Sequence, residues 1–261
     1  MDYMQGMHDL LSRISSADII VIGGSYAGLM ATYEASRRGF KTILIEEEPC
    51  ISPYIYYGGI WGYVVISKNL HDLLIRDLGL RMIKKVDEVY LVDSNEFYTK
   101  ILAKIYDLGG YVLTGFFIEP YYNVDEEGNL ELVGVLIRRS DENRMSNYMA
   151  IKARYIIDSS GLDASFSQYI IERIKPPIIP AGPGPIIPGS NEVFERTYWL
   201  VEENIVTAGL AAASIFGAAI PYPDVTPLIL SGRRAIELII ESMEKVSERR
   251  THEDKYIPGI I

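Results

Sequence analysis

The sequence predicts an α/β fold built on a parallel sheet, and three observations near its start predict it. Residues 19–22 form a short β-branched run, residues 23–28 form a glycine-rich turn, and apolar residues then continue at helical spacing. Gly39 ends this helix, and a second apolar run follows at residues 43–45. A strand, a turn, a helix and a second strand in this order form a βαβ unit, whose two strands pair in parallel.

The glycine-rich turn carries the first functional indication. Amide groups at a helix start, together with the positive end of the helix dipole, form a natural site for an anion such as a pyrophosphate. Gly23 permits the tight turn, and Gly28 lets the helix approach the strand. Ser25 replaces the usual central glycine, so its Cβ narrows the approach of phosphate while its hydroxyl can donate to a phosphate oxygen.

A carboxylate at the end of the second strand completes this pattern. Glu46 lies about twenty residues past the turn, where the dinucleotide fingerprint has an acid that accepts hydrogen bonds from an adenosine ribose. We therefore expect this unit to bind a dinucleotide. The alternative is a βαβ turn with a structural role only.

The remaining segments supply helices and strands around this unit. Helical patterns cover residues 1–16, 70–78, 94–108 and 228–243, and strand patterns cover residues 111–118, 130–138, 152–161 and 204–209. An acidic turn at 125–129 joins two strands, residues 140–147 are a polar loop, and residues 210–216 carry small side chains suited to close packing. The Pro/Gly-rich segment 176–189 is expected to form a lid, an arm or a subunit contact, and residues 246–261 form a charged tail.

Composition limits the classes of protein and partner. With 261 residues, 48% of them hydrophobic and 23% charged, the chain is expected to form a single dinucleotide-binding domain over residues 1–261. A formal net charge of −10 argues against nucleic acid as a partner. The sequence has no long uncharged apolar stretch and no basic secretory start, so we expect no membrane association and a cytoplasmic location. The single cysteine, Cys50, rules out an intramolecular disulfide and a cysteine-cluster metal site.

Three separated segments match one pattern. They are GGSYAGL in the first turn, GGIWG at residues 58–62, and NEVFERTYWLVEENIVTAGLAAASIFG at residues 191–217. In these segments the chain resembles the thiamine thiazole synthase family, over roughly residues 18–240. The resemblance implies an FAD/NAD(P)-binding, Rossmann-like, three-layer ββα fold of the glutathione-reductase type. It also implies NAD as a consumed substrate, from which the family builds an adenylated thiazole with glycine and a sulfur source, and a homo-oligomeric ring.

The resemblance also assigns dinucleotide contacts in this chain. They fall on Ala27 in the turn, on Glu46 and Glu47 at the strand end, on Gly59 in the second segment, and on Ile118 and Leu210, which would use their backbone. A flavoprotein of this fold places an Asp directly after the late glycine, to bind the ribityl chain. Here Leu210 follows Gly209, which argues against FAD.

The departures from the family fall on its chemistry. The positions of the sulfur-donating or imidazole residue and of an iron-binding Asp are Met145 and Asn147, and the position of a second iron ligand, a His, is Leu162. A thioether and a hydrocarbon side chain are poor ligands for hard divalent iron, so these positions disfavour an iron site. His8, His71 and His252 lie elsewhere, and the position of a glycine-gripping Arg is Ile220.

Several residues keep two interpretations. Asp163 is the best local acid or base, and both it and Asp158 could act on the ligand or serve as a helix cap or a solvent-facing group. Arg233 and Arg234 are interpreted as a solvated helix face, and Cys50 as a structural thiol. The leading hypothesis is a thiazole-synthase-like protein that binds NAD or an ADP-ribose or ADP-thiazole derivative and draws sulfur from free sulfide. The alternatives are a non-catalytic paralogue that binds a dinucleotide, and an FAD-dependent oxidoreductase.

Overall fold

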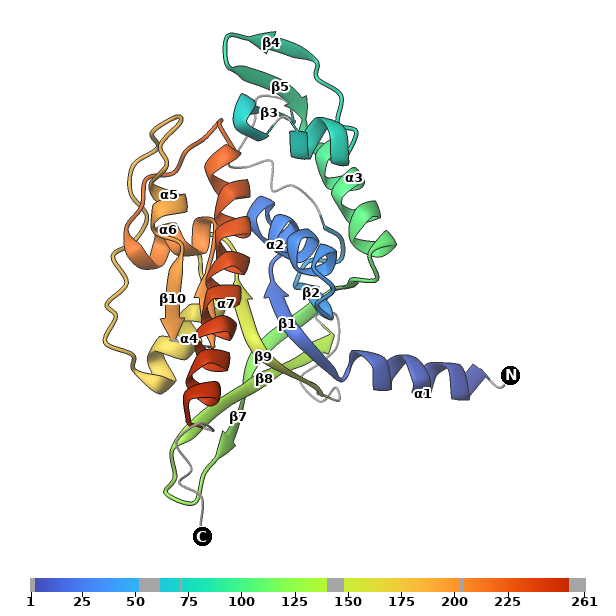
Figure 1. Cartoon of the computed structure of the whole chain (residues 1–261), viewed down its shortest axis with the longest axis vertical. Coiled ribbons are helices and arrows are strands. Elements are labelled where there is room, and N and C mark those ends of the chain that lie inside the picture. The colour runs from blue at the N-terminus through green and yellow to red at the C-terminus, as the bar shows by residue number, and fades with distance from the viewer. Residues whose placement is uncertain (1–2, 52–61, 71, 140–147, 202–203, 254–261) are drawn as a thin grey trace.

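The computed structural model describes residues 3–51, 62–70, 72–139, 148–201 and 204–253, and its centre is one mixed sheet (Figure 1). The strand order is β10-β11-β9-β1-β2-β6, and β8 joins β9 to a hairpin with β7. The strands are β1 (Ser16–Ile22), β2 (Thr42–Glu46), β6 (Tyr111–Thr114), β7 (Phe116–Val124), β8 (Leu130–Arg139), β9 (Met149–Asp158), β10 (Tyr198–Val201) and β11 (Ile205–Thr207). β1 pairs in parallel with both β2 and β9, as the βαβ pattern predicts.

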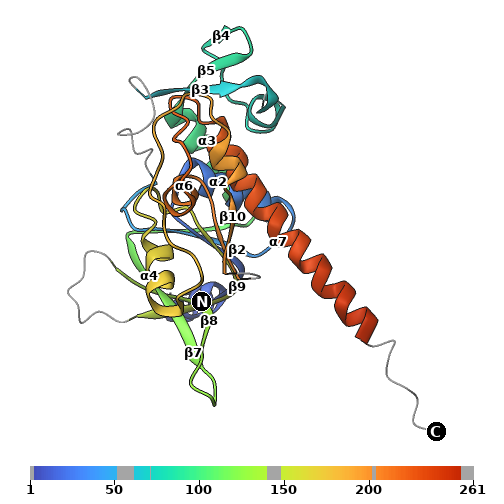
Figure 2. The same cartoon turned by 90° about the vertical axis from the view of Figure 1, so that its left-hand side faces the viewer.

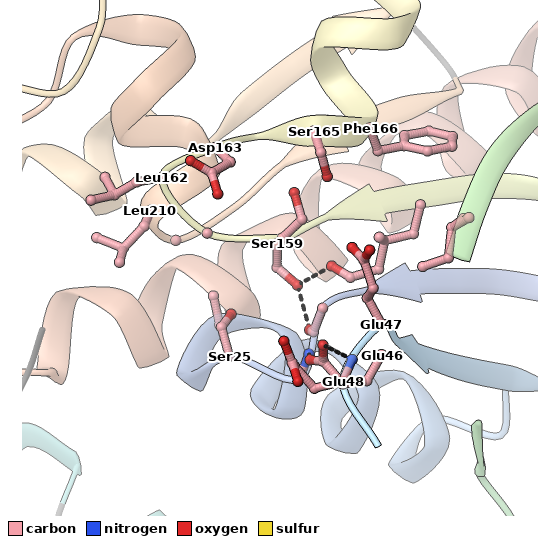
Figure 3. Close-up of a pocket in the computed structure, with 18 of the residues that line it drawn as sticks. Ser25, Glu46, Glu47, Glu48, Ser159, Leu162, Asp163, Ser165, Phe166 and Leu210 are labelled. Carbon is pink, nitrogen blue, oxygen red and sulfur yellow. Dashed lines mark hydrogen bonds between the residues drawn. The ribbon is translucent and has the colours of Figure 1, made fainter. Parts of the chain in front are cut away.

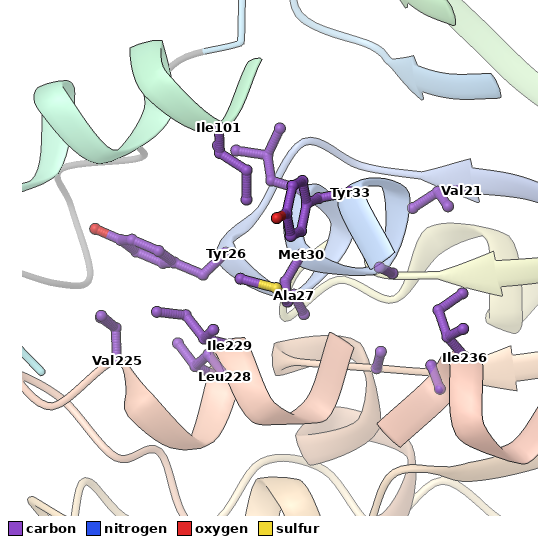
Figure 4. Close-up of a cluster of buried hydrophobic side chains, with 14 of the residues drawn as sticks. Val21, Tyr26, Ala27, Met30, Tyr33, Ile101, Val225, Leu228, Ile229 and Ile236 are labelled. Carbon is purple, nitrogen blue, oxygen red and sulfur yellow. The ribbon is translucent and has the colours of Figure 1, made fainter. Parts of the chain in front are cut away.

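Helices cover one face of this sheet. They are α2 (Tyr26–Arg37), α3 (Ser94–Asp107) and α7 (Thr226–Glu253). Side chains that alternate along β1, such as Ile19 and Val21, pack with this helical layer. In Figure 4 Ala27 and Met30 of α2 face Leu228 and Ile229 of α7. α7 approaches α2 so closely that a Cβ on Gly232 would lie 2.1 Å from the carbonyl oxygen of Ala27.

The opposite face is covered by the β7–β8 hairpin together with α4 (Ser165–Ile174) and α6 (Leu210–Phe216). Ile20 and Ile22 of β1 point into this second apolar cluster, with Phe166 and Ile170 of α4. The fold therefore has three layers, a helical layer, the central sheet and a β-hairpin layer, which confirms the predicted α/β class.

A second, smaller sheet lies beside α3 at one end of the molecule (Figure 1). It is formed by β3 (Tyr63–Ser67), β5 (Val89–Asp93) and β4 (Lys84–Val86) in the order β3-β5-β4, with every pair antiparallel. A short 3₁₀ turn (Lys68–Leu70) and a π-helical segment (Asp72–Asp77) follow β3, where a helix over residues 70–78 is predicted. The sequence patterns did not predict this sheet.

The termini of the described chain are helical. α1 (Tyr3–Ile14) projects from the body in Figure 1, and α7 extends past the sheet in Figure 2. The predicted end of the last helix at residue 243 and the predicted tail from residue 246 are wrong in part, because α7 continues to Glu253. Within the described residues, no helix has both the length and the apolar character that crossing a membrane requires.

Gly115 divides one predicted strand into two, and the Pro/Gly-rich segment lacks regular structure. The predicted strand 111–118 is two strands, because Gly115 has a φ of +78° and breaks the run between β6 and β7. The Pro/Gly-rich segment 176–189 forms no helix and no named strand. Its backbone instead bonds along the end of α6 and the segment after it, through pairs such as Gly182 N–H to Ser214 O and Gly184 N–H to Ala218 O.

Candidate functional site

A cavity of about 610 Å³ opens where β1, β2 and β9 end at their carboxyl termini (Figure 3). In parallel sheets this edge is where ligands bind, because turns and helix starts converge there. Its walls come from the β1–α2 turn, the end of β2, the β9–α4 loop, the start of β7, the end of β8 and the start of α6. The site is thus assembled from segments spread over most of the chain.

The β1–α2 turn has the geometry that its glycines predict. Gly23 has a φ of +92°, and a Cβ there would lie 2.6 Å from the carbonyl oxygen of Ser159. A Cβ on Gly28 would lie 2.0 Å from the carbonyl oxygen of Gly23 and 2.4 Å from Ser159 Oγ, so only glycine fits at this contact between helix and strand. Gly28 lies beneath the turn and does not line the cavity, whereas Gly23, Ser25 and Ala27 do.

Ser25 is the N-cap of α2. Its Oγ accepts a hydrogen bond from the amide of Gly28 at 3.2 Å, and its φ and ψ of −70° and 174° are extended. Because the cap uses the hydroxyl oxygen as an acceptor, the hydroxyl hydrogen can still donate into the cavity. The serine in place of a central glycine therefore both starts the helix and offers a donor at its positive end.

Glu46 holds the β1–α2 turn against the end of β2. Its Oε2 accepts from the amide of Gly24 at 2.6 Å, and its Oε1 accepts from the amide of Glu48 at 3.1 Å. A carboxylate has about four lone-pair sites, so these two bonds leave acceptor capacity for ligand hydroxyls. Figure 3 shows Glu46 beside the turn that bears Ser25, with Glu47 and Glu48 nearby.

The β9–α4 loop closes the cavity from the other side of β1. The hydroxyl of Ser159 donates to the carbonyl oxygens of Ile22 and Gly23, at 2.7 Å and 2.9 Å. Asp158 is fully buried, and its carboxylate accepts from the amides of Ser160 and Ser167, at 3.0 Å and 2.8 Å, and from the hydroxyl of Ser167. Asp158 therefore accepts from groups in the first turn of α4, which supports its interpretation as a helix cap. Asp163 is exposed and lines the cavity.

The wall formed by β7 and β8 carries a cation that the sequence patterns did not single out. Arg138 of β8 lies opposite Phe117 of β7, and its guanidinium carbon is 4.2 Å from the centroid of the Phe117 ring. Both residues line the cavity. Partial burial and the charges of Glu46 and Glu48 raise the pKa of Glu47, while the charge of Arg138 acts in the opposite direction. Two adjacent Phe and two adjacent Arg residues on either side of the predicted turn were the available signal.

The structure brings most of the predicted site residues together. Those that line the cavity are Gly23, Ser25, Ala27, Glu46, Glu47, Ile118, Asp163 and Leu210. Gly59, Met145 and Asn147 lie outside the described residues. Leu162, at the family position of an iron-binding His, also lines the cavity, and in Figure 3 it lies near Leu210 and Asp163.

Arg233 and Cys50 are not among the residues that line the cavity. Arg233 does not belong to a solvated face, because it donates to Glu34, whose side chain is fully buried, at 3.0 Å and 3.1 Å; that interpretation is wrong. Cys50 is an exposed free thiol and is not among the residues that line the cavity. Among the described residues, no group of three or more His, Cys, Asp or Glu side chains could hold a metal ion.

A glycine turn and a strand-end glutamate share one cavity at the carboxyl ends of parallel strands, in a fold with a helical layer and a β-hairpin layer. This arrangement defines a Rossmann-like α/β protein. The Thi4 family model matches residues 2–220, and the chain belongs to the Thi4 family.

Similar proteins agree with this assignment. The thiamine thiazole synthase of Saccharolobus islandicus is 27% identical, over 94% of this chain and 92% of its own length. That of Sulfolobus acidocaldarius is 24% identical, over 92% of this chain and 91% of its own length. The crystal structure of Thermovibrio ammonificans THI4 superposes with a TM-score of 0.82 at 20% identity, covering 92% of this chain and 95% of that one, which shows a shared fold.

Proposed function

We propose that this Thi4-family chain binds NAD, or an ADP-ribose or ADP-thiazole derivative, in the cavity at the carboxyl ends of β1 and β2. One observation carries the proposal: the start of α2 and the carboxylate of Glu46 line the same cavity of about 610 Å³. The first supplies amide donors and a positive dipole end, and the second supplies ribose acceptors. The volume is in the range of small-molecule and cofactor pockets, which is roughly 300–1,000 Å³.

Different cavity residues suit different parts of this ligand. The turn at Gly23, with the Ser25 hydroxyl, suits the pyrophosphate, and Glu46 beside it suits the hydroxyls of the adenosine ribose. The backbone at Ile118 and at Leu210 then flanks the two ends of the ligand. Asp163 is exposed on the cavity wall and lies near Leu210 (Figure 3), so its carboxyl group is a candidate to move a proton at the end of the ligand that Leu210 flanks.

We further propose a thiazole-synthase-like reaction that uses NAD, glycine and free sulfide. Cys50 does not line the cavity, so its thiol is not placed to give sulfur to a ligand there. Leu162 stands where the family resemblance implies an iron-binding His. Its hydrocarbon side chain has no lone pair for a metal ion, so this position does not fit a bound iron.

Leu162 also favours a second candidate, a paralogue that binds the dinucleotide and does not turn it over. The two candidates differ in one result. Conversion of NAD, glycine and sulfide to an adenylated thiazole by the unaltered protein supports synthesis. An inactive protein that gains turnover only when His replaces Met145 and Leu162 and Asp replaces Asn147 supports the second candidate.

The binding proposal is tested by identifying the molecule that copurifies with the protein. The protein is purified without added nucleotide and denatured, and the released compound is analysed by absorbance and mass spectrometry. NAD, ADP-ribose or an adenylated thiazole is the expected result. A flavin absorbance spectrum and the mass of FAD would overturn the proposal and favour the FAD oxidoreductase instead.

A further inference from the structure

The cavity wall opposite the phosphate turn carries Arg138, which none of the roles above uses. Its guanidinium carbon lies 4.2 Å from the centroid of Phe117, its cross-strand partner, which is within the range of a cation–π contact. Both Phe117 and Arg138 line the cavity, so a ligand there can reach the pair.

The order of the cavity residues places this cation beyond the ribose site. Gly24 at the phosphate turn donates to Glu46, and Glu47 follows directly along the chain. β6 pairs with β2 on the side away from β1, and the amide of Gly115, just before β7, donates to the carbonyl oxygen of Glu48 at 2.8 Å. Phe117 and its cross-strand partner Arg138 therefore lie on the side of Glu46 that is remote from the start of α2. In a nucleotide the base lies on the side of the ribose opposite the phosphate-bearing carbon. A ligand with its pyrophosphate at α2 and its ribose at Glu46 therefore extends its base toward Phe117 and Arg138.

We infer that Arg138, held against the Phe117 ring, stacks on the adenine of the bound nucleotide and is a specificity-determining residue of this pocket. The inference rests on the proposed function. A planar guanidinium can stack on a purine, as arginine does on nucleic-acid bases, and its contact with an aromatic ring restricts its motion before a ligand binds. This contact would favour ligands with a purine over ligands that lack a base.

The main competing role for this arginine is a contact with a phosphate on the ribose 2′ oxygen. An arginine near the ribose accommodates that phosphate in NADP-binding folds. Here Glu46, Glu47 and Glu48 all line the same region of the cavity, and three carboxyl groups repel a dianion. The arrangement therefore favours the base over a second phosphate.

The neighbouring residue is a matched control. Arg139 lies opposite Phe116 with its guanidinium carbon 5.7 Å from that ring, so it makes the same kind of contact on the same two strands. Successive strand residues point to opposite faces of a sheet, and neither Arg139 nor Phe116 lines the cavity. Arg139→Met thus reproduces the loss of charge and of an aromatic contact without touching the site.

The test is titration calorimetry of AMP, ADP-ribose and adenosine 2′,5′-bisphosphate against the full chain, as wild type, Arg138→Met, Arg138→Lys and Arg139→Met. We expect Arg138→Met to weaken AMP and ADP-ribose by the same factor, roughly 5- to 30-fold, which corresponds to a desolvated cation–π contact. Arg138→Lys keeps the charge and loses the plane, so it should show a similar loss. Arg139→Met should remain within about twofold of wild type.

Three other results would each overturn either the inference or the proposed function. Unchanged AMP and ADP-ribose affinity in Arg138→Met overturns the inference and leaves the proposed function intact. Selective loss of adenosine 2′,5′-bisphosphate binding, with AMP unaffected, overturns it in favour of a phosphate contact. If the wild type binds none of the three ligands, the proposed function itself is overturned. Thermal unfolding of each variant identifies a folding defect, and if Arg138→Met fails to fold, Arg138→Lys decides between these outcomes.

Discussion

At the scale of single residues, the β1–α2 turn is constrained most tightly at Gly28. Its missing Cβ would overlap the carbonyl oxygen of Gly23 at 2.0 Å, and the carbonyl is held in turn by the hydroxyl of Ser159. We expect Gly28→Ala to destabilise the protein by roughly 1–3 kcal/mol or more, because the backbone must shift. Thermal unfolding should show a melting temperature lower by several degrees. The control is Gly6→Ala on α1, where a Cβ meets nothing within 4 Å; equal loss in both variants would contradict the steric account.

Glu46 tests the ribose site. Glu46→Gln keeps one oxygen, which can accept from the amide of Gly24, but it loses the acceptor for the amide of Glu48 and the charge that strengthens hydrogen bonds from ribose hydroxyls. We expect ADP-ribose affinity to fall roughly tenfold or more, since hydrogen bonds to charged groups are worth about 1.5–3 kcal/mol. Calorimetric titration measures this change. Glu131→Gln, on β8 and away from the cavity, should bind like wild type, and an unaltered affinity in Glu46→Gln would rule out its ribose role.

The sequence predicted these residues because their signals are local. Gly23, Ser25, Gly28 and Glu46 lie within one βαβ unit, whose geometry follows from the order of its elements. Arg138 could not be found in that way. Its place in the cavity depends on the register between β7 and β8, which shifts between Tyr121 and Tyr122 and which no residue pattern revealed.

At the scale of elements, the buried carboxylate of Asp158 positions α4 against the end of β9. It accepts from the amides of Ser160 and Ser167 and from the Ser167 hydroxyl, and α4 has no side-chain cap of its own. We expect Asp158→Ala to destabilise the protein by about 2–4 kcal/mol, because two amides lose their acceptor in a buried setting. Denaturant unfolding measures the loss.

Asp125 provides the matched comparison for this prediction. It also accepts from backbone amides, those of Glu127 and Asn129 at 2.9 Å and 2.8 Å, but in an exposed turn at the end of the β7–β8 hairpin. Water replaces those bonds on truncation, so Asp125→Ala should cost less than about 1 kcal/mol. If the two variants were equally destabilised, burial would not be the cause of the Asp158 effect.

The elements also show where sequence patterns fail. Long periodic segments, such as those that became α3 and α7, were predicted with errors only at their ends. The small sheet β3-β5-β4 was not predicted, because its strands have three to five residues and their pairing is set by contacts with α3 and α7. Gly115, which separates β6 from β7, lies within an otherwise continuous apolar run.

At the scale of the whole molecule, Glu34 ties α2 to α7. Its fully buried carboxylate accepts from Arg37 on its own helix, from Arg38 at the C-cap of that helix, and from Arg233 on α7. Burial alone would raise the pKa of Glu34, but the hydrogen bonds from Arg37 and Arg38 and the charge of Arg233 outweigh it, so the pKa is lowered. This ion cluster holds α7 against the C-terminal end of α2, the helix that follows the β1–α2 turn.

The pH dependence follows from this lowered pKa. A carboxyl group whose folded pKa lies below its unfolded value of about 4.3 adds stability above that value and loses it as pH falls through the folded pKa. We expect Glu34→Gln to cost about 3–5 kcal/mol at pH 7, where three arginines lose their counter-charge, and the gap from wild type to shrink toward pH 3. Melting temperatures from pH 7 to pH 3 test it. Glu237→Gln, which breaks an exposed pair with Arg234, should change little, and a gap that stays constant with pH would contradict the assignment.

We propose that the cavity at the carboxyl ends of β1, β2 and β9 binds an adenine dinucleotide or its ADP-ribose core. The most direct measurement is calorimetric titration of ADP-ribose into the nucleotide-free wild-type protein, with FAD titrated in parallel. We predict saturable binding of one ADP-ribose per chain, with weaker or no binding of FAD. Saturable binding of FAD with no binding of ADP-ribose or NAD would contradict the claim.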